Sequence, residues 1–338
     1  MAKIIDAFLF FQELDLLEIR LAYMDPHVDR FVIVEACQTF SGKPKDFVFE
    51  KHSQRFAKYL HKIEYQKLTD FHSDFASVQQ HLKNAATPSQ QKVLAMLEQH
   101  THYPKTELHW VLDSYHRECI HLALDRIAEP DDVVILSDLD EIPSTDLFSA
   151  SNLAAIREQP RVCRQREFRY FLNYFKDADW LGTIAGLQQV ISQQSLNLLR
   201  IDSKQTRKIV HPVPIENGGY HFTSCGGIDM IREKIKSWGH QELNNSVVIN
   251  NIEKNVRSGQ DIFQRETGTN LKRVDIFDTL YFDAAMSEAV ASYRHLISSE
   301  QIDVVEPSLY RDVWRRAIMT WQKIQYKMGR KLKPRGSV

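Results

Sequence analysis

The sequence DDVVILSDLDEIP, residues 131–143, decides the fold of this chain. Its four consecutive apolar residues, 133–136, are mostly β-branched and predict a buried strand of a parallel sheet. Three carboxylates follow at Asp138, Asp140 and Glu141, and Pro143 then prevents the strand from continuing. Because open α/β sheets bind ligands outside the carboxyl ends of their strands, this acidic segment marks a candidate ligand site.

Asp138 and Asp140 are two residues apart, so their side chains point to the same side of an extended chain. Two carboxylates without a neighbouring His or Cys suit a hard cation such as Mg²⁺ or Mn²⁺ that also holds a phosphate. The alternative is a solvated acidic turn after a strand, because Asp is also a common turn former.

Strands and helices alternate along the first part of the chain. Apolar segments at 4–11 and 31–34 predict strands, whereas 13–22 and 110–127 have the spacing of helices. This alternation predicts an α/β fold with a mostly parallel, doubly wound central sheet. Residues 72–107 are polar, rich in Gln and His and without clear periodicity, and we expect them to form a variable insertion over the sheet.

The composition is that of a soluble globular protein, with 43% hydrophobic and 26% charged residues among 338. Lys and Arg total 43 against 44 Asp and Glu, which argues against a dedicated nucleic-acid binder. The four cysteines are far apart and predict neither a zinc site nor a disulfide framework. No signal-peptide pattern and no long apolar stretch occur, so we expect a cytoplasmic protein.

Residues 301–338 differ in character from 1–300, which we expect to form one catalytic domain. Trp314, Ile318 and Trp321 recur at helical spacing among basic residues, and a basic tail follows. Such a helix can make a peripheral contact with an anionic membrane. We favour the alternative, in which the apolar stripe packs on the core, because most amphipathic helices face a core.

Four further positions suggest ligand binding. Glu35 ends the second strand and either contacts a base or ribose or caps a nearby loop. Arg117 precedes the acidic segment and either approaches a diphosphate or forms a helix-surface ion pair. Gly226 and Gly227 open a predicted helix whose backbone N–H groups face phosphates or a sugar.

Segments along most of the chain occur in the order found in one family. They are FLFFQELDLLEIRL at 8–21, FVIVEA at 31–36, TFSGKP at 39–44, Arg117, SDLDEIP at 137–143, YHF at 220–222, GGI at 226–228, KIKS at 234–237, HQE at 240–242 and GQDIF at 259–263. Together they closely resemble the family 17 glycosyltransferases. These are the β-1,4-N-acetylglucosaminyltransferases that add the bisecting sugar to N-glycans, with their microbial and viral relatives.

The resemblance implies a GT-A type fold, a carbohydrate acceptor and a nucleotide-sugar donor, with UDP-N-acetylglucosamine (UDP-GlcNAc) expected. It implies a divalent cation, Mn²⁺ or Mg²⁺, that Asp138 and Asp140 hold through the diphosphate, and inversion at the anomeric carbon. It also implies that His240, or less favourably His221, completes the metal shell. In contrast to the animal members of this family, we expect no membrane anchor in this protein and a different segment at 72–107, so an N-glycan acceptor is not assumed.

Inverting transfer needs a base that takes the proton of the acceptor hydroxyl. We expect Asp229, which follows the Gly pair, to be this base, with Glu141 and Glu242 as alternatives. Arg117 or Arg265 would neutralise the leaving diphosphate beside the metal.

Two other functions fit the same residues. A metal-dependent nucleotidyltransferase would attack phosphorus instead of carbon, and a non-catalytic nucleotide-sugar-binding protein would attack neither. The products separate them, because only a nucleotidyltransferase releases pyrophosphate and only a glycosyltransferase releases nucleoside diphosphate.

Overall fold

The structure, a computed structural model, describes residues 2–85, 87–204, 209–238, 240–263, 265, 268–306, 313, 317 and 320. The side chain of Glu242 lies outside this description. The basic helix predicted beyond residue 310 also lies outside it, apart from three single positions.

The described residues form a mixed α/β fold around one nine-stranded sheet, ordered β3-β2-β1-β4-β7-β6-β8-β5, with β9 paired to β7. The strands are β1 (Ile4–Leu9), β2 (Arg30–Ala36), β3 (Ile63–Leu68), β4 (Val133–Asp138), β5 (Glu141–Pro143), β6 (Arg161–Arg169), β7 (Tyr174–Leu187), β8 (Gly219–Thr223) and β9 (Lys272–Arg273). β1 to β4 are mutually parallel, and only β5 and β7 run in the opposite direction. The predicted α/β class with a mostly parallel sheet is confirmed.

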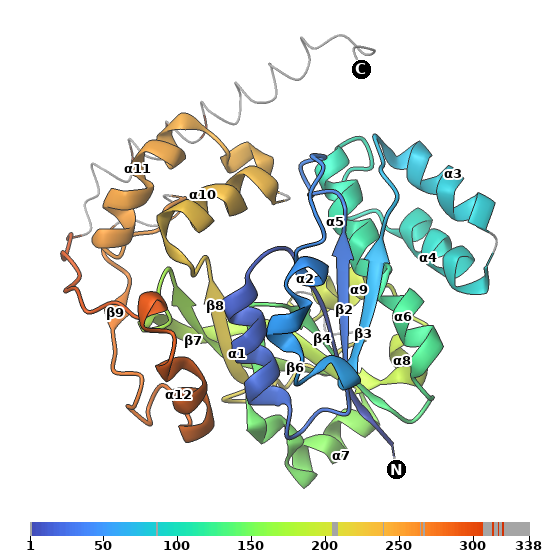
Figure 1. Cartoon of the computed structure of the whole chain (residues 1–338), viewed down its shortest axis with the longest axis horizontal. Helices are drawn as coiled ribbons and strands as arrows, with labels where there is room; N and C mark the ends of the chain where they lie inside the picture. Colours follow the sequence, from blue (N-terminus) through green and yellow to red (C-terminus); the bar gives the residue numbers. More distant parts are fainter. Residues whose placement is uncertain are drawn as a thin grey trace.

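Helices cover both faces of this sheet (Figure 1). They are α1 (Leu14–Met24), α2 (Val48–Lys51), α3 (Phe75–Ala85), α4 (Pro88–Gln99), α5 (Leu108–Glu118), α6 (Ile120–Ile127), α7 (Ala150–Glu158), α8 (Gln188–Ile191), α9 (Leu196–Asp202), α10 (Gly227–Ser237), α11 (Ser246–Arg257) and α12 (Ala284–Ala291). Short 3₁₀ turns lie at η1 (Ser53–Phe56), η2 (Leu60–Lys62), η3 (Thr145–Phe148), η4 (Gln241–Leu243) and η5 (Arg294–Leu296).

Alternate residues of each central strand enter different hydrophobic cores. In β1, Phe8 belongs to a core with α1 and α12, whereas Ile5 and Ala7 belong to a core with α3 to α6. This follows from the two-residue period of a strand, and it explains why the strands are apolar throughout. A third, smaller core joins α10 and α11 to Tyr170 and Tyr174.

The 72–107 segment contains the helices α3 and α4, which pack against the sheet side that α5 and α6 also cover. Pro88 opens α4, and the Thr87 side chain caps it by accepting from Gln90 N–H. The helix predicted over 110–127 is divided at Cys119 into α5 and α6. Among the described residues, no helix is long and apolar enough to cross a membrane.

The sheet must curl beyond β4. β5 begins three residues after β4 ends, which allows at most ~11 Å of chain. Four strand intervals separate β4 from β5 along the sheet, which would be ~19 Å if it were flat. The curl brings β8 and β5 back beside the end of β4, so both halves of the sheet surround the acidic turn.

Candidate active site

A pocket of about 640 Å³ lies at the carboxyl ends of the strands. Its described lining contains more cations than carboxylates: Lys45, Arg117, Arg169, Arg200, Lys204, Lys234 and Arg265 against Glu13, Asp113, Asp138, Asp140 and Glu167. Strand order reverses between β1 and β4, so the pocket sits at the point where open α/β sheets bind ligands. An excess of positive charge suits an anionic ligand there.

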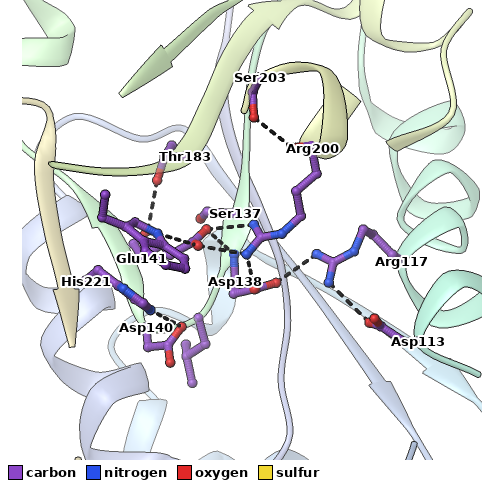
Figure 2. Close-up of polar contacts among 12 residues, drawn as sticks. Asp113, Arg117, Ser137, Asp138, Asp140, Glu141, Thr183, Arg200, Ser203 and His221 are labelled. Carbon is purple, nitrogen blue, oxygen red and sulfur yellow. Dashed lines mark hydrogen bonds and ion pairs between the residues drawn. The ribbon is translucent and has the colours of Figure 1, made fainter. Parts of the chain in front are cut away.

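Asp138 ends β4 and is held by two arginines (Figure 2). Arg117 of α5 donates from Nη1 to Oδ1 over 2.8 Å, and Arg200 of α9 donates from Nη2 to Oδ2 over 2.6 Å. Burial raises the pKa of Asp138, but the two guanidinium groups outweigh this and bring it far below its usual range. Asp138 is therefore an anion that fixes both arginines at the pocket wall.

Glu141 is fully buried behind Asp138 and does not line the pocket. Arg200 donates to its two carboxylate oxygens over 2.8 and 2.9 Å, and Trp180 Nε1 donates over 2.9 Å. Burial raises the pKa of Glu141, but the positive charge of Arg200 outweighs this effect and lowers the pKa to about 2. A carboxylate that is already bonded in this way cannot reach an acceptor hydroxyl, so the geometry does not support Glu141 as the base.

Asp140 lies on the other side of the acidic turn, beside β8 and α10. Lys234 Nζ is 2.9 Å from Oδ2, and His221 Nε2 is 3.9 Å from Oδ1. Burial lowers the pKa of Lys234, but the negative charges of Asp140 and Glu13 together outweigh it and raise the pKa above its usual value, so the lysine stays charged. Burial lowers the pKa of His221, whose ring stacks on Trp180 with centroids 4.1 Å apart, so this imidazole is neutral near pH 7.

Arg20 of α1 holds the backbone of the acidic turn from the buried side, through hydrogen bonds to its carbonyl groups. It is fully buried and pairs with Asp6 of β1 over 2.5 and 2.8 Å. Its Nη1 donates to the carbonyls of Asp138, Leu139 and Glu141 over 2.9, 3.1 and 3.1 Å. The turn is thus fixed through its carbonyls, which leaves the carboxylates of Asp138 and Asp140 to face the pocket.

The acidic turn meets the needs of a divalent cation only in part. Both oxygens of Asp138 face guanidinium groups, whereas the one charged or titratable group recorded near Oδ1 of Asp140 among the described residues is the distant His221 ring. No group of three or more His, Cys, Asp or Glu in the described residues could form a metal cage. One carboxylate fits Mg²⁺ or Mn²⁺ where substrate phosphates supply further ligands.

The end of the pocket at β1 and β2 is apolar and aromatic. Phe10, Val34, Ala36 and Phe40 are among its lining residues. Glu35 is not, because its side chain turns away from the pocket. This geometry favours the capping alternative for Glu35 over the predicted contact with a base or ribose.

The bonds of Glu35 explain this orientation. Its carboxylate accepts from the N–H groups of Val48 and Phe49 at the start of α2, from Lys45 Nζ and from the Tyr65 hydroxyl. Four donors satisfy a fully buried carboxylate, which has no bonding capacity left for a nucleotide.

The Gly pair and Asp229 lie outside the pocket. Gly226 and Gly227 have φ angles of 116° and 86°, which shows why glycine stands there, and Gly227 does open α10. The side chain of Asp229 is 94% exposed and pairs with Arg232 over 2.9 Å. This geometry does not support the predicted contact of the Gly pair with phosphate or the predicted role of Asp229 as the base, because none of the three is among the residues that line the pocket.

Two of the predicted site residues, His240 and Arg265, do line the pocket. The His240 ring packs against Trp110 and Trp238, with centroids 4.8 and 5.1 Å away. Arg265 pairs with Asp261 over 2.9 Å, away from the acidic turn. Neither is bonded to Asp138 or Asp140 in the described structure, so the placement of His240 in a metal shell stays a prediction.

Sequence reasoning missed the cations that complete the site. Arg200 lies in α9 after the apolar residues 198 and 199, and nothing local shows that it turns toward β4. Lys204 lies 4.2 Å from the centroid of the Trp180 ring and was missed for the same reason. Lys234 opens the segment 234–237, one of those that resemble the family, and its position there was the sequence signal that could have identified it as a site residue.

The first part of the chain matches a known protein family. Residues 1–97 match the model of Glycosyltransferase family 17, which confirms the resemblance predicted from the sequence and supports a glycosyltransferase. No curated protein matches. The matched range includes β1 to β3 and Arg20, whereas the acidic turn lies beyond it.

Proposed function

We propose, from this family match and the geometry of the pocket, that the protein transfers a sugar from a nucleoside-diphosphate sugar to a carbohydrate acceptor. The observation that carries the proposal is the acidic turn at the end of β4, ringed by Arg117, Arg200 and Lys234 in a pocket at the sheet's switch point. Planar guanidinium groups and an ammonium bind a diphosphate and stabilise it as a leaving group.

The distribution of apolar and cationic lining residues suggests one orientation for the donor. Its base would lie at the apolar end near β1 and β2, and its diphosphate would meet the cations at β4. The sugar would then point toward β6 and β8. A GT-A type fold, UDP-GlcNAc as donor and inversion at the anomeric carbon are further parts of the proposal, and they rest on the family resemblance.

A divalent cation belongs to this proposal at Asp140. With His221 and the donor phosphates as neighbours, this carboxylate would hold Mg²⁺ or Mn²⁺, which would act as a Lewis acid on the leaving diphosphate. In this proposal Asp138 would position Arg117 and Arg200, with which it forms ion pairs, whereas the sequence assigned it to the metal.

We look for the catalytic base, which takes the proton of the acceptor hydroxyl, among the carboxylates that line the pocket. Asp229 and Glu141 do not face it, and the side chain of Glu242 is not described. Glu13 and Glu167 line the pocket outside the acidic turn and can be tested by Glu→Gln substitution. Loss of a general base lowers the rate by ~10²–10⁴-fold and spares donor affinity.

Thermal shift with a panel of nucleotide sugars, with and without Mn²⁺, tests the donor class. A ligand at 100 times its dissociation constant adds about 2.7 kcal/mol to the free energy of unfolding. We expect UDP-GlcNAc to stabilise the protein and Arg200→Met to abolish the shift, while the exposed Asp229→Asn serves as the matched control. Stabilisation by no nucleotide sugar would overturn the proposal.

Product analysis then separates the other two functions. Incubation with the stabilising donor should release nucleoside diphosphate. Pyrophosphate from a nucleoside triphosphate would instead show a nucleotidyltransferase, and binding without any release from the donor would show a non-catalytic binding protein.

A further inference from the structure

Lys204 is the one cation of the pocket lining for which the described part of the chain supplies no carboxylate partner. The other six each form an ion pair with a carboxylate: Lys45, Arg117, Arg169, Arg200, Lys234 and Arg265. Lys204 is exposed and lines the pocket. Because an ammonium carries three donors, Lys204 keeps bonding capacity for an anionic ligand that enters the pocket.

The ring of Trp180 fixes the place of this free ammonium. Lys204 Nζ lies 4.2 Å from the ring centroid, within the range of a cation–π contact. The indole is itself held, because its Nε1 donates to Glu141 over 2.9 Å and its ring stacks on His221. A contact with a ring face positions the ammonium and leaves its N–H groups available to an oxygen acceptor.

The order of the strands places Lys204 relative to the proposed donor. The base would lie at the end of the pocket near β1 and β2, and β4, which carries Asp138, lies between β1 and β7 in the sheet. Trp180 belongs to β7, so Lys204 lies on the far side of Asp138 from the base. In a nucleoside-diphosphate sugar, the phosphate farther from the base is the one that carries the sugar.

We propose that Lys204 binds the sugar-bearing phosphate of the donor and makes the pocket selective for nucleoside diphosphates over nucleoside monophosphates. This inference rests on the proposed glycosyltransferase function, which supplies the orientation of the donor. The competing role is structural: Lys204 would support the Trp180 ring and contact no ligand. Its loss would then lower the stability of the protein without changing the preference for a second phosphate.

The charge state of Lys204 gives a readout that a structural role would not move. The surrounding protein displaces water from the ammonium and lowers the pKa of Lys204 to about 8; Arg200 and Arg117 add to this effect, whereas Glu141 and Asp138 oppose it. These four neighbours keep their charges between pH 7 and 9, because the pKa of each carboxylate is lowered and that of each guanidinium is raised. A bound phosphate favours the protonated lysine, so diphosphate affinity should fall as the pH rises through the pKa of the free enzyme.

The experiment measures nucleotide affinities of the full chain by calorimetry at constant Mg²⁺, with weak ligands measured by displacement of UDP. The ligands are uridine, UMP, UDP and UDP-GlcNAc, and the proteins are wild type, Lys204→Met and Lys204→Arg. Lys67→Met is the matched control, because Lys67 Nζ also lies over a ring, 4.4 Å from that of Phe47, but does not line the pocket. Uridine reports any effect of pH on the base alone.

At pH 7, Lys204→Met should bind UDP and UDP-GlcNAc roughly 10- to 100-fold more weakly than wild type, because one charge-assisted contact is lost. Its affinities for uridine and UMP, and all affinities of Lys67→Met, should stay within about twofold of wild type. From pH 7 to pH 9, wild type should lose UDP-GlcNAc affinity relative to uridine by about 3- to 10-fold, the smaller value applying if solvent in the pocket weakens the pKa shift. Lys204→Met should lose none, and Lys204→Arg should bind equally at both pH values because a guanidinium stays charged.

Unchanged UDP affinity in Lys204→Met overturns the inference, and so do equal losses for UMP and UDP. A pH dependence in Lys204→Met that matches wild type has the same consequence, since another group would then be titrating. Reduced stability in urea with normal affinities would assign Lys204 to the support of Trp180 instead. A wild type that binds neither UDP nor UDP-GlcNAc contradicts the proposed function itself.

Discussion

Replacing Glu141 by Gln tests whether this buried carboxylate supports the site or acts as its base. The substitution keeps the shape of the side chain and removes the charge that Arg200 neutralises. It also turns an amide N–H₂ toward donors that previously met a carboxylate oxygen, namely Arg200 and Trp180. We therefore expect a loss of stability at neutral pH with the same fold.

The pKa of Glu141 gives the magnitude. It falls from 4.5 to about 2 in the folded protein, because the Arg200 charge outweighs the opposing effect of burial. A carboxyl whose pKa is lowered by folding stabilises the protein above its unfolded pKa, and this stabilisation is lost as the pH falls toward the folded pKa. A shift of this size corresponds to about 3 kcal/mol at pH 7, of which about 2 kcal/mol disappears between pH 6 and pH 3.

Urea unfolding of wild type and Glu141→Gln at pH 7, 6, 5, 4 and 3 measures both quantities. The variant should unfold about 3 kcal/mol more easily at pH 7, and the difference should shrink to about 1 kcal/mol at pH 3. Two curves that stay parallel over this range would refute the linkage. A variant of normal stability that had lost sugar transfer would restore Glu141 to the role of base.

Three further predictions concern residues to which we now assign roles other than those expected from the sequence. Asp140→Asn should lose only the Mn²⁺-dependent part of UDP affinity, whereas Asp138→Asn should lower UDP affinity roughly 10-fold even in chelator, because Arg117 and Arg200 lose their anchor. Calorimetry with Mn²⁺ and with EDTA measures both effects, and the same metal dependence in the two variants would contradict these separate roles of Asp138 and Asp140. Asp229→Asn should change stability by less than about 0.5 kcal/mol and leave transfer near normal, because its side chain is solvated; a rate reduced 100-fold would return the base to this residue. Glu35→Gln should lower the free energy of unfolding by about 3 kcal/mol and leave UDP affinity unchanged, since the buried charge binds protein groups alone; weakened UDP binding in a stable variant would show a ligand contact instead.

The central strands could be predicted because burial on both faces leaves a continuous apolar run in the sequence. The segments at 4–11, 31–34 and 133–136 coincide with β1, β2 and β4. The direction of β7 could not be predicted, since its second half, which pairs with β4, is buried on both faces and has the same composition whether its neighbours run parallel or antiparallel. The break at Cys119 was missed because that residue keeps helical backbone angles, so no Gly or Pro marks it.

The site was predictable where its residues are adjacent in sequence and unpredictable where they are not. Asp138 and Asp140 stand at the end of a recognisable strand, so the sequence of the turn alone identifies them as candidates. Their partners Arg200 and Lys234 come from helices far along the chain, and their direction depends on how those helices pack. Glu35 had the same position at a strand end as Asp138, but the N–H groups of the following α2 took up its carboxylate.

The buried pair of Arg20 and Asp6 explains how the matched and unmatched parts of the chain form one site. Arg20 belongs to the segment that carries the family match, and it bonds turn carbonyls 118 to 121 residues away. Burying two charges is costly unless every hydrogen bond is made, and here the guanidinium is bonded to Asp6, to the Ser137 hydroxyl and to the turn. That bonding can be satisfied only when β1, α1 and the acidic turn are assembled together. The same contacts that complete the switch point of the sheet therefore also set the positions from which Asp138 and Asp140 meet the ligand.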